Sequence, residues 1–224
     1  MTAFFYRYWH YYTGFYRVKN KSKIFCIGCN KTGTTSLQEE FKNLGFVVGQ
    51  QVIAERLMQR HFFKDNLQPI LDFCKSAQVF QDVPFNRLKL LEHIDRAYPN
   101  SRFILTERDS PEQWYRSLTK FHAKLFGKNG QVPTGDDLLA VDYIAPGFTA
   151  KVMLSSGTSL DNPYHKPTLI NNYLHHNQAV KTYFKDRPDD LLIINLSEEG
   201  AYKKFIHFLG ISSLHSDFPW ENKT

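Results

Sequence analysis

The sequence contains few cysteines, and their positions exclude two kinds of cysteine chemistry. Three cysteines in 224 residues are too few for the disulfide framework of a small secreted domain. Cys26 and Cys29 form a C-x-x-C pair, but no second pair or histidine cluster completes a zinc site, and Cys26 falls inside an apolar strand pattern. No cleavable signal sequence precedes them. We therefore expect no bound metal and a reducing, cytoplasmic setting.

The first part of the chain lacks acidic residues. Residues 1–22 combine many aromatic side chains with Arg7, Arg17, Lys19 and Lys21, and contain no Asp or Glu. No apolar run there approaches the roughly 20 residues that a membrane-spanning helix needs. Tyrosine, tryptophan and cations are typical of segments at a membrane surface, yet the same side chains can pack across a domain. We expect a packed terminal arm, with peripheral membrane contact as the alternative.

The rest of the composition is that of an ordinary folded protein. Hydrophobic residues make up 42% of the chain, aromatic residues 15% and charged residues 22%, which is typical of neither a disordered nor a fibrous protein. The length predicts one domain over residues 1–224. The formal net charge of +6 suits an anionic partner, but nucleic acid, acidic lipid, sulfated sugar and a phosphorylated cofactor would all satisfy it. Charge alone therefore does not select the partner.

Short apolar runs alternate along the chain with segments of helical periodicity. This alternation predicts parallel strands joined by right-handed crossovers, which gives a three-layer α/β fold with a central parallel sheet and helices on both faces. The segment 127–167, rich in Gly, Pro, Ser and Asn, is typical of an irregular insertion. The expected strands are 23–29, 46–48, 79–83, 102–106 and 191–195, and the expected helices are 34–44, 52–60, 67–76, 87–97, one beginning at Pro111, 168–186 and 199–209.

The loop after the first expected strand has the composition of a phosphate-binding loop. Residues 28–36 have the sequence GCNKTGTTS, and a glycine-containing loop that opens a helix points backbone amides at an anion. In nucleotide triphosphatases the second glycine is followed by lysine and then serine or threonine. Here Thr34 and Thr35 follow Gly33, and the lysine lies inside the loop at Lys31. An atypical P-loop kinase is therefore only an alternative.

The run Lys31-Thr32-Gly33-Thr34-Thr35-Ser36 resembles the 5'-phosphosulfate-binding loop of the sulfotransferase family that uses 3'-phosphoadenosine 5'-phosphosulfate (PAPS), in particular its bacterial-type members. The family's second element is a strand ending in an arginine, followed by a helix with a serine, which together grip the 3'-phosphate. Arg108 and Ser117 match it, but Ser117 lies one residue further on than in the family, so Ser110 is a second candidate. The resemblance implies a P-loop-type fold, PAPS as the donor, and cofactor-binding residues Lys31, Thr32, Gly33, Thr34, Thr35, Ser36, Arg108 and Ser117.

Transfer of a sulfuryl group resembles phosphoryl transfer, because both are in-line displacements that depend on positioning and charge stabilisation. We expect Lys31 to supply the cation near the leaving oxygen. The resemblance places the family's catalytic histidine or glutamate at or near Asp82. We expect Asp82 to be the base, since burial would raise its proton affinity. The alternatives are that Asp82 only pairs with a cation such as Arg87, and that His122 is the base.

The predicted function is transfer of a sulfuryl group from PAPS to a hydroxyl or amine of a small molecule, carbohydrate or lipid, with no nucleic acid as partner. One alternative is the atypical kinase, which needs a magnesium-binding acid such as Asp82 and a nucleoside triphosphate. Another is a non-catalytic module that binds polyanions through a basic face and the arm 1–22. Trp114 has the spacing of a buried helix stripe, although an indole can also stack on adenine.

Overall fold

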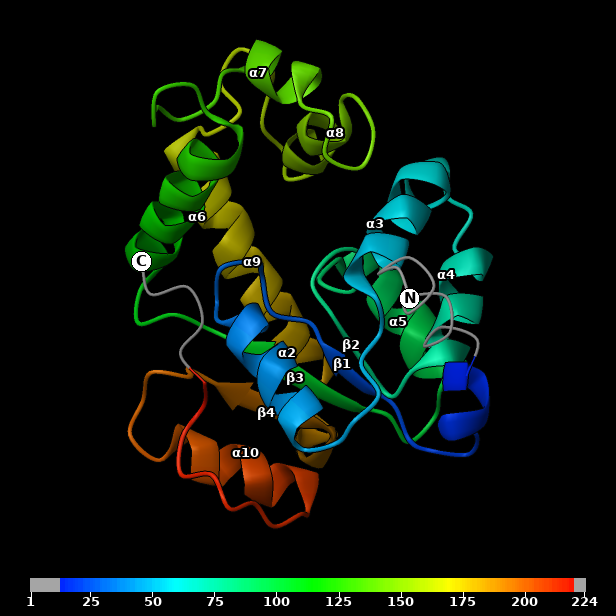
Figure 1. Ribbon diagram of the computed structural model, residues 1–224. Helices are drawn as coiled ribbons and strands as arrows, with labels where there is room; N and C mark the ends of the chain where they lie inside the picture. The colour runs from blue at the N-terminus through cyan, green and yellow to red at the C-terminus, as the bar shows by residue number, and fades with distance from the viewer. Residues whose placement is uncertain (1–12, 220–224) are drawn as a thin grey trace, which may run out of the picture. The chain divides into compact units, whose positions relative to one another are not determined.

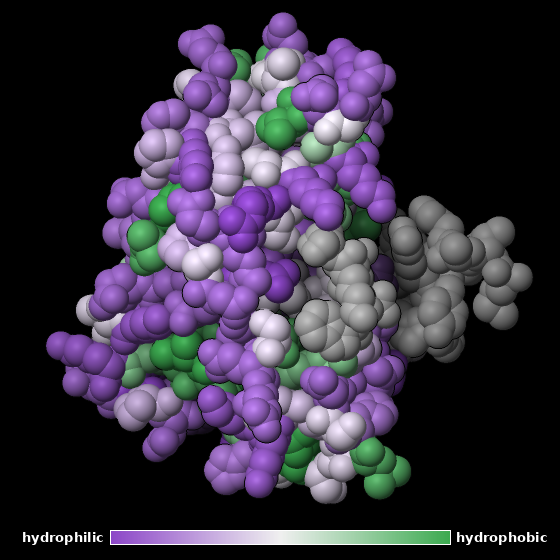
Figure 2. Space-filling model, turned by 90° about the vertical axis from the view of Figure 1, so that its left-hand side faces the viewer, coloured by the Kyte–Doolittle hydropathy of each residue, from purple (hydrophilic) through white to green (hydrophobic). Residues whose placement is uncertain are grey.

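The computed structural model describes residues 13–219. The described chain divides into two compact units, of which the first contains residues 13–107 and 180–219 and the second contains residues 108–179. The prediction of one domain over 1–224 stays a prediction. No helix among the described residues is both long enough and apolar enough to span a membrane. On the face of the molecule shown in Figure 2, hydrophilic side chains predominate and hydrophobic ones form small separate groups.

The first unit is built on a four-stranded parallel sheet with the order β2-β1-β3-β4. The strands are β1 (Ile24–Cys26), β2 (Val79–Gln81), β3 (Arg102–Thr106) and β4 (Leu191–Ile194). Each comes from one of the short apolar runs, as expected for strands buried in a parallel sheet. The predicted α/β fold with a central parallel sheet is confirmed (Figure 1).

Three strand predictions were wrong in extent. The expected strand 23–29 is limited to Ile24–Cys26. The expected strand 46–48 is reduced to a single bridge between Val48 and Val79, because the run is short and the next residue, Gly49, already leads toward a helix. The expected strand 79–83 stops at Gln81, because Asp82 has a left-handed φ of 62° that a pleated strand does not accommodate.

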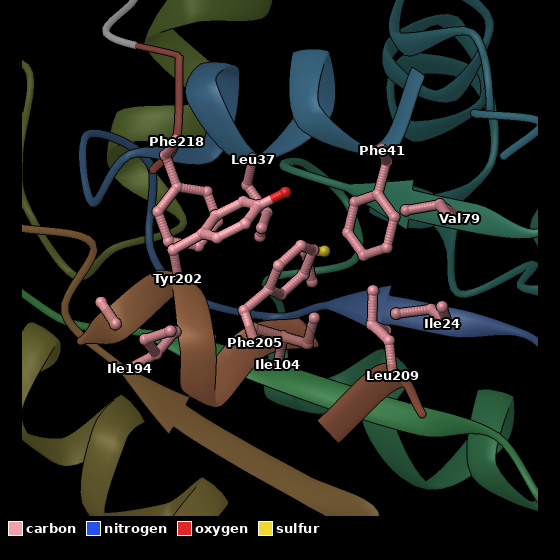
Figure 3. Packing of buried hydrophobic residues seen from close by; sticks show 12 residues of the cluster. Ile24, Leu37, Phe41, Val79, Ile104, Ile194, Tyr202, Phe205, Leu209 and Phe218 are labelled. Carbon is pink, nitrogen blue, oxygen red and sulfur yellow. The ribbon is translucent and has the colours of Figure 1, made fainter. Parts of the chain in front are cut away.

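Alternate residues of the strands face opposite sides of the sheet, as the period of two requires. On one side, Ile24, Ile104 and Ile194 pack against α2 (Thr34–Asn43) and α10 (Ala201–Leu209). Figure 3 shows Phe41 of α2 and Phe205 of α10 turned toward each other, and their ring centroids lie 5.2 Å apart. Burying such a ring stabilises the fold by about 2 kcal/mol, so this cluster fixes α2 firmly on the sheet.

The opposite side of the sheet has an aromatic core. Phe25 of β1 lies between Phe80 of β2 and Phe103 of β3, with centroid distances of 5.6 Å to each. Phe73 at the end of α4 (Gln68–Phe73) contacts Phe80, and α5 (Leu88–Ala97) adds a buried stripe that includes Ile94. Helices therefore cover both faces of the sheet (Figure 1).

The remaining parts of the first unit follow the sequence pattern closely. Helix α3 spans Gln51–Arg60 and is followed by the 3-10 turn η1 (Phe62–Lys64). The expected helix 67–76 is α-helical only over α4 and ends in the 3-10 turn η2 (Cys74–Ser76), while η3 (Pro188–Asp190) precedes β4. Gly210 ends α10 with a left-handed φ of 66°, as expected of a glycine after a helix.

The part of the predicted arm that the structure describes packs on the first unit. Residues 13–17 are helical, and Val18 is buried. A Cβ atom at Gly14 would lie 2.0 Å from the carbonyl oxygen of Ser76, so glycine permits a close approach of two backbone segments. Residues 1–12 of the predicted arm lie outside the described residues.

The second unit contains α6 (Pro111–Phe126), α7 (Gly135–Ala140), α8 (Phe148–Leu154) and most of α9 (Lys166–Tyr183). Pro111 occupies the first turn of α6, as predicted, after the N-cap residue Ser110. Trp114 is 6% exposed and stacks on Tyr173 with centroids 4.6 Å apart, so Trp114 belongs to the core of this unit.

The segment 127–167 is more ordered than its composition predicts. A capping box between Thr134 and Asp137 starts α7. Helix α8 was not predicted. Gly147, with a left-handed φ of 72°, precedes it, and the hydroxyl of Thr149 donates to the carbonyl oxygen of Leu138 at 2.7 Å. A tertiary hydrogen bond thus holds a helix that is too short to be stable alone.

Candidate active site

The loop between β1 and α2 requires glycine at two positions. A Cβ atom at Gly28 would lie 2.2 Å from Oγ1 of Thr106 and 2.7 Å from its backbone nitrogen and oxygen, so only glycine permits this approach to the end of β3. Gly33 has a φ of 100° and is the N-cap of α2. The two glycines bring the chain from the edge of the sheet directly into the helix.

No side chain caps the N-terminus of α2. The first amides of a helix have no partner within the helix, and the helix dipole places partial positive charge there. Thr34 and Ser36 in this first turn are buried, whereas Thr35 is exposed. An uncapped helix start after a glycine loop, at the carboxyl edge of a parallel sheet, has the free amides and the partial positive charge that suit a phosphate group.

Lys31 places a cation in the same loop. Its φ of 70° is left-handed. This backbone conformation costs a residue with a side chain about 1 kcal/mol or more, and residues that adopt it are concentrated at functional sites. Lys31 is half-buried, and its charge acts on the carboxyl group of Asp82. The loop therefore holds Lys31 in a backbone conformation that is unfavourable for a residue with a side chain.

Thr32 is turned into the protein. Its side chain donates to the carbonyl oxygen of Cys29 and lies 2.5 Å from the hydroxyl of Thr106, and the residue is 1% exposed. The sequence predicts that Thr32 binds the donor. Because its side chain is turned inward, only its backbone can contact a phosphate group.

Asp82 follows β2 directly and lies at the same edge of the sheet, where its carboxylate accepts from the amide of Val83 at 2.7 Å. Burial raises the pKa of the Asp82 carboxyl above its ordinary value. The hydrogen bonds from Val83 and Asn30 and the charges of Arg87 and Lys31 oppose this shift without cancelling it. A carboxylate with raised pKa is a stronger base than an ordinary aspartate.

Two side chains that the sequence analysis did not single out join the Asp82 segment to the phosphate loop and to α3. Asn86 donates from Nδ2 to Oδ1 of Asn30, and Gln51 donates to the carbonyl oxygen of Val83 at 2.9 Å. Asn30 lies within the predicted phosphate-binding loop 28–36, but no spacing in the sequence indicates that Asn86 is its partner.

Arg87 and Cys29 lie in the same surroundings. Burial lowers the pKa of the Arg87 guanidinium, and the charge of Asp82 opposes that shift. Burial raises the pKa of the Cys29 thiol to about 12, so Cys29 is not a thiolate nucleophile near neutral pH. Among residues 13–219 no group of three His, Cys, Asp or Glu side chains is arranged to hold a metal ion.

Arg108 and Ser117, the predicted 3'-phosphate residues, belong to the second unit. The backbone amide of Arg108 donates to the hydroxyl of Tyr173 at 3.0 Å, and burial lowers the pKa of its guanidinium. Ser117 is 8% exposed, and its hydroxyl has no hydrogen-bond partner among the described residues. By contrast, the hydroxyl of Ser110 accepts from the amide of Gln113 as the cap of α6.

His122, the alternative candidate for the catalytic base, is also in the second unit. Its Nδ1 lies 2.7 Å from the hydroxyl of Tyr164, and the two rings meet edge to face. Thus Lys31 to Ser36 and Asp82 come together at the carboxyl edge of the sheet in the first unit, whereas Arg108, Ser117 and His122 stand in the second.

The fold and this loop define an α/β protein of the P-loop type. Residues 23–224 match the family model described as a sulfotransferase domain, and the chain therefore belongs to the sulfotransferase family. No curated protein matches the sequence. Membership of this family makes the chain a transferase of sulfuryl groups.

Proposed function

We propose that the protein transfers the sulfuryl group of PAPS to a hydroxyl or amine acceptor. The observation that carries this proposal is the start of α2, where an uncapped helix N-terminus, Gly33 and Lys31 meet at the carboxyl edge of the sheet. A phosphate-bearing donor fits this combination of amides and one cation.

The predicted residues have separate roles in holding the donor. Its 5'-phosphosulfate is held by Lys31, Gly33, the backbone of Thr32 and the first turn of α2 (Thr34, Thr35 and Ser36). Its 3'-phosphate is held by Arg108 and Ser117. A buried hydroxyl without a partner costs about 1–3 kcal/mol, and a bound phosphate oxygen supplies an acceptor for the hydroxyl of Ser117.

The bound donor supplies a sulfuryl group, whose bond to the 5'-phosphate oxygen breaks as the acceptor oxygen or nitrogen bonds to sulfur. Lys31 stabilises the negative charge that develops on the leaving phosphate. Asp82 takes the proton of the acceptor, and its raised pKa suits it to this role. Asn86, through Asn30, positions the Asp82 segment beside the phosphate loop.

The acceptor class is a small molecule, carbohydrate or lipid, because each presents the hydroxyl or amine that the reaction consumes, and nucleic acid is not proposed as a partner. We place the protein in the cytoplasm. The cysteines Cys26, Cys29 and Cys74 are free thiols, which supports a reducing compartment.

A thermal-stability titration tests the proposal. Adenosine 3',5'-bisphosphate, the product of the donor, should stabilise the wild type, since saturation to a hundred times Kd contributes about 2.7 kcal/mol. Lys31→Ala and Arg108→Ala should each reduce that shift. Arg56→Ala, which removes an exposed cation from α3, should leave it unchanged and is the matched control.

The other outcomes separate the alternatives. A shift with magnesium-ATP alone would indicate the atypical kinase and contradict the sulfuryl donor. No shift with either nucleotide, together with salt-sensitive retention on a polyanion, would indicate a binding module. Release of the bisphosphate from PAPS that depends on an added acceptor would then establish turnover.

A further inference from the structure

Helix α6 of the second unit presents three cations on one face. Arg116, Lys120 and Lys124 are spaced by four residues, so they lie about 6 Å apart along the helix axis. All three are exposed. None of them forms an ion pair with another residue between 13 and 219. Three uncompensated charges in a row favour an anionic partner.

The same face borders a groove with a volume of about 520 Å³. Its lining includes the three cations together with Thr119, Ala123 and Val132. Val132 is 44% exposed, and no acid lines the groove among the described residues. The groove therefore combines a cationic wall with an apolar floor.

Two acidic side chains of the second unit are paired with lysines outside the groove. Glu112 forms an ion pair with Lys166 at 2.6 Å, and Asp137 forms one with Lys128 at 2.6 Å. Neither Glu112 of α6 nor Asp137 of α7 therefore neutralises the three cations of the groove.

The chemistry of the lining favours one anionic surface over others. A groove that binds single-stranded nucleic acid combines cations with aromatic side chains that stack on the bases, and a small-molecule site carries polar groups placed to orient its ligand. The hydroxyl of Thr119 is already bonded to the carbonyl oxygens of Tyr115 and Arg116, and no aromatic side chain lines the described groove. Charge plus exposed aliphatic surface is what a membrane with acidic headgroups recognises.

We infer that the α6 groove docks the second unit on acidic phospholipid headgroups. The three cations contact the headgroup phosphates, and Val132 enters the boundary between headgroups and acyl chains. This contact is separate from the peripheral membrane contact that is the alternative reading of the arm 1–22, and it does not depend on the donor or acceptor of the proposed reaction.

Co-sedimentation of the full chain with vesicles tests this inference. Vesicles of phosphatidylcholine containing phosphatidylserine should bind the wild type, and vesicles of phosphatidylcholine alone should not. The triple variant Arg116→Gln/Lys120→Gln/Lys124→Gln should bind about a hundredfold more weakly, since each cation contributes about 1 kcal/mol at an acidic surface. Val132→Asn should weaken binding by a smaller factor.

A matched triple variant controls for net charge. Arg56→Gln/Lys64→Gln/Lys203→Gln removes three exposed cations from the first unit and should bind like the wild type. Equal losses in both triple variants would overturn the inference, as would undiminished binding of the α6 variant, which would assign the contact to another part of the chain. Retention on a sulfated polysaccharide through the same three side chains, without vesicle binding, would also overturn it. Unchanged thermal unfolding of both variants confirms that each is folded.

Discussion

The hydroxyl groups of Thr32 and Thr106 lie 2.5 Å apart, which ties the phosphate loop to the last residue of β3. Both residues are almost completely buried, and Gly28 packs against Thr106 from the other end of the loop. The loop is therefore anchored at both ends on one threonine. Contacts within the protein hold the shape of the loop, so less conformational entropy is lost on binding.

We expect Thr106→Val to destabilise the protein by about 1–2 kcal/mol, because the isosteric side chain leaves the buried hydroxyl of Thr32 with one partner fewer. Affinity for adenosine 3',5'-bisphosphate should fall as well, since the loop loses an anchor. Urea unfolding and calorimetric titration measure the two effects. Thr106→Ser keeps the hydroxyl and should restore the affinity. An affinity unchanged in Thr106→Val would show that the loop does not need this anchor.

Gly33→Ala should cost about 1–2 kcal/mol of stability, because its φ of 100° is disfavoured for a residue with Cβ. The added methyl group also meets Cδ2 of Leu196 at 3.0 Å, so that side chain must give way. Because the strained φ lies at the N-cap of α2, bisphosphate binding should fall at least tenfold. Gly45→Ala is the control, since Gly45 has a φ of 79° but open space around it. The control should lose stability without losing affinity, and equal loss of affinity in both variants would contradict the assignment of the loop.

Asp82→Asn should lower kcat by a factor of about 100 to 10,000, the usual contribution of a general base, and should leave bisphosphate affinity nearly unchanged. Asparagine still accepts from the amide of Val83, so the segment keeps its shape. In the wild type, kcat/KM should rise with pH through a pKa above the ordinary aspartate value of about 3.9, because burial raises it. The variant should lack this acidic limb, and a variant with wild-type turnover would exclude Asp82 as the base.

The same pKa shift affects stability with a definite sign. The folded state holds the Asp82 proton more tightly than the unfolded state, so the carboxyl stabilises the fold when protonated. That contribution is complete below about pH 3.9 and is lost as pH rises through the raised folded pKa. Asp82→Asn should therefore be at least as stable as the wild type at neutral pH, which urea unfolding at several pH values measures.

The sequence predicts the sheet and most helices because their signals are local. Each buried strand is an apolar run between polar segments, and the glycine after α10 is a local helix stop. The reduction of the expected strand 46–48 to a single bridge and the presence of helix α8 were not predicted, because tertiary contacts decide both. The bridge depends on Val79 across the sheet, and α8 depends on the carbonyl group of Leu138.

The candidate site was predictable where one continuous segment carries it. The run from Lys31 to Ser36 is contiguous in sequence and in space. The inward turn of Thr32 and the bond between Asn30 and Asn86 were not predictable, because each involves a partner more than 50 residues away. The resemblance to sulfotransferases identified Asp82 as the candidate base, and only the structure shows that burial raises the pKa of its carboxyl group.

Ser110, the N-cap of α6, and Ser117, two turns into the helix, differ in their hydrogen bonds, which makes their substitutions diagnostic. Ser110→Ala removes the oxygen that caps the helix at Gln113 and should cost about 1 kcal/mol of stability without affecting bisphosphate affinity. Ser117→Ala removes a buried hydroxyl that has no partner in the described chain. It should leave the free energy of unfolding unchanged or raise it, because no hydrogen bond is lost and an unpaired buried hydroxyl is unfavourable.

If Ser117 holds the 3'-phosphate, Ser117→Ala should weaken binding of adenosine 3',5'-bisphosphate about tenfold, the equivalent of one hydrogen bond to a charged group. Adenosine 5'-monophosphate, which lacks the 3'-phosphate, should bind wild type and variant equally. The reverse pattern, with affinity lost in Ser110→Ala and kept in Ser117→Ala, would assign the contact to Ser110, since its hydroxyl would have to leave the cap to reach the ligand. Measuring unfolding and binding on the same four proteins, namely wild type, each single variant and the double variant, separates the loss of a helix cap from the loss of a ligand contact.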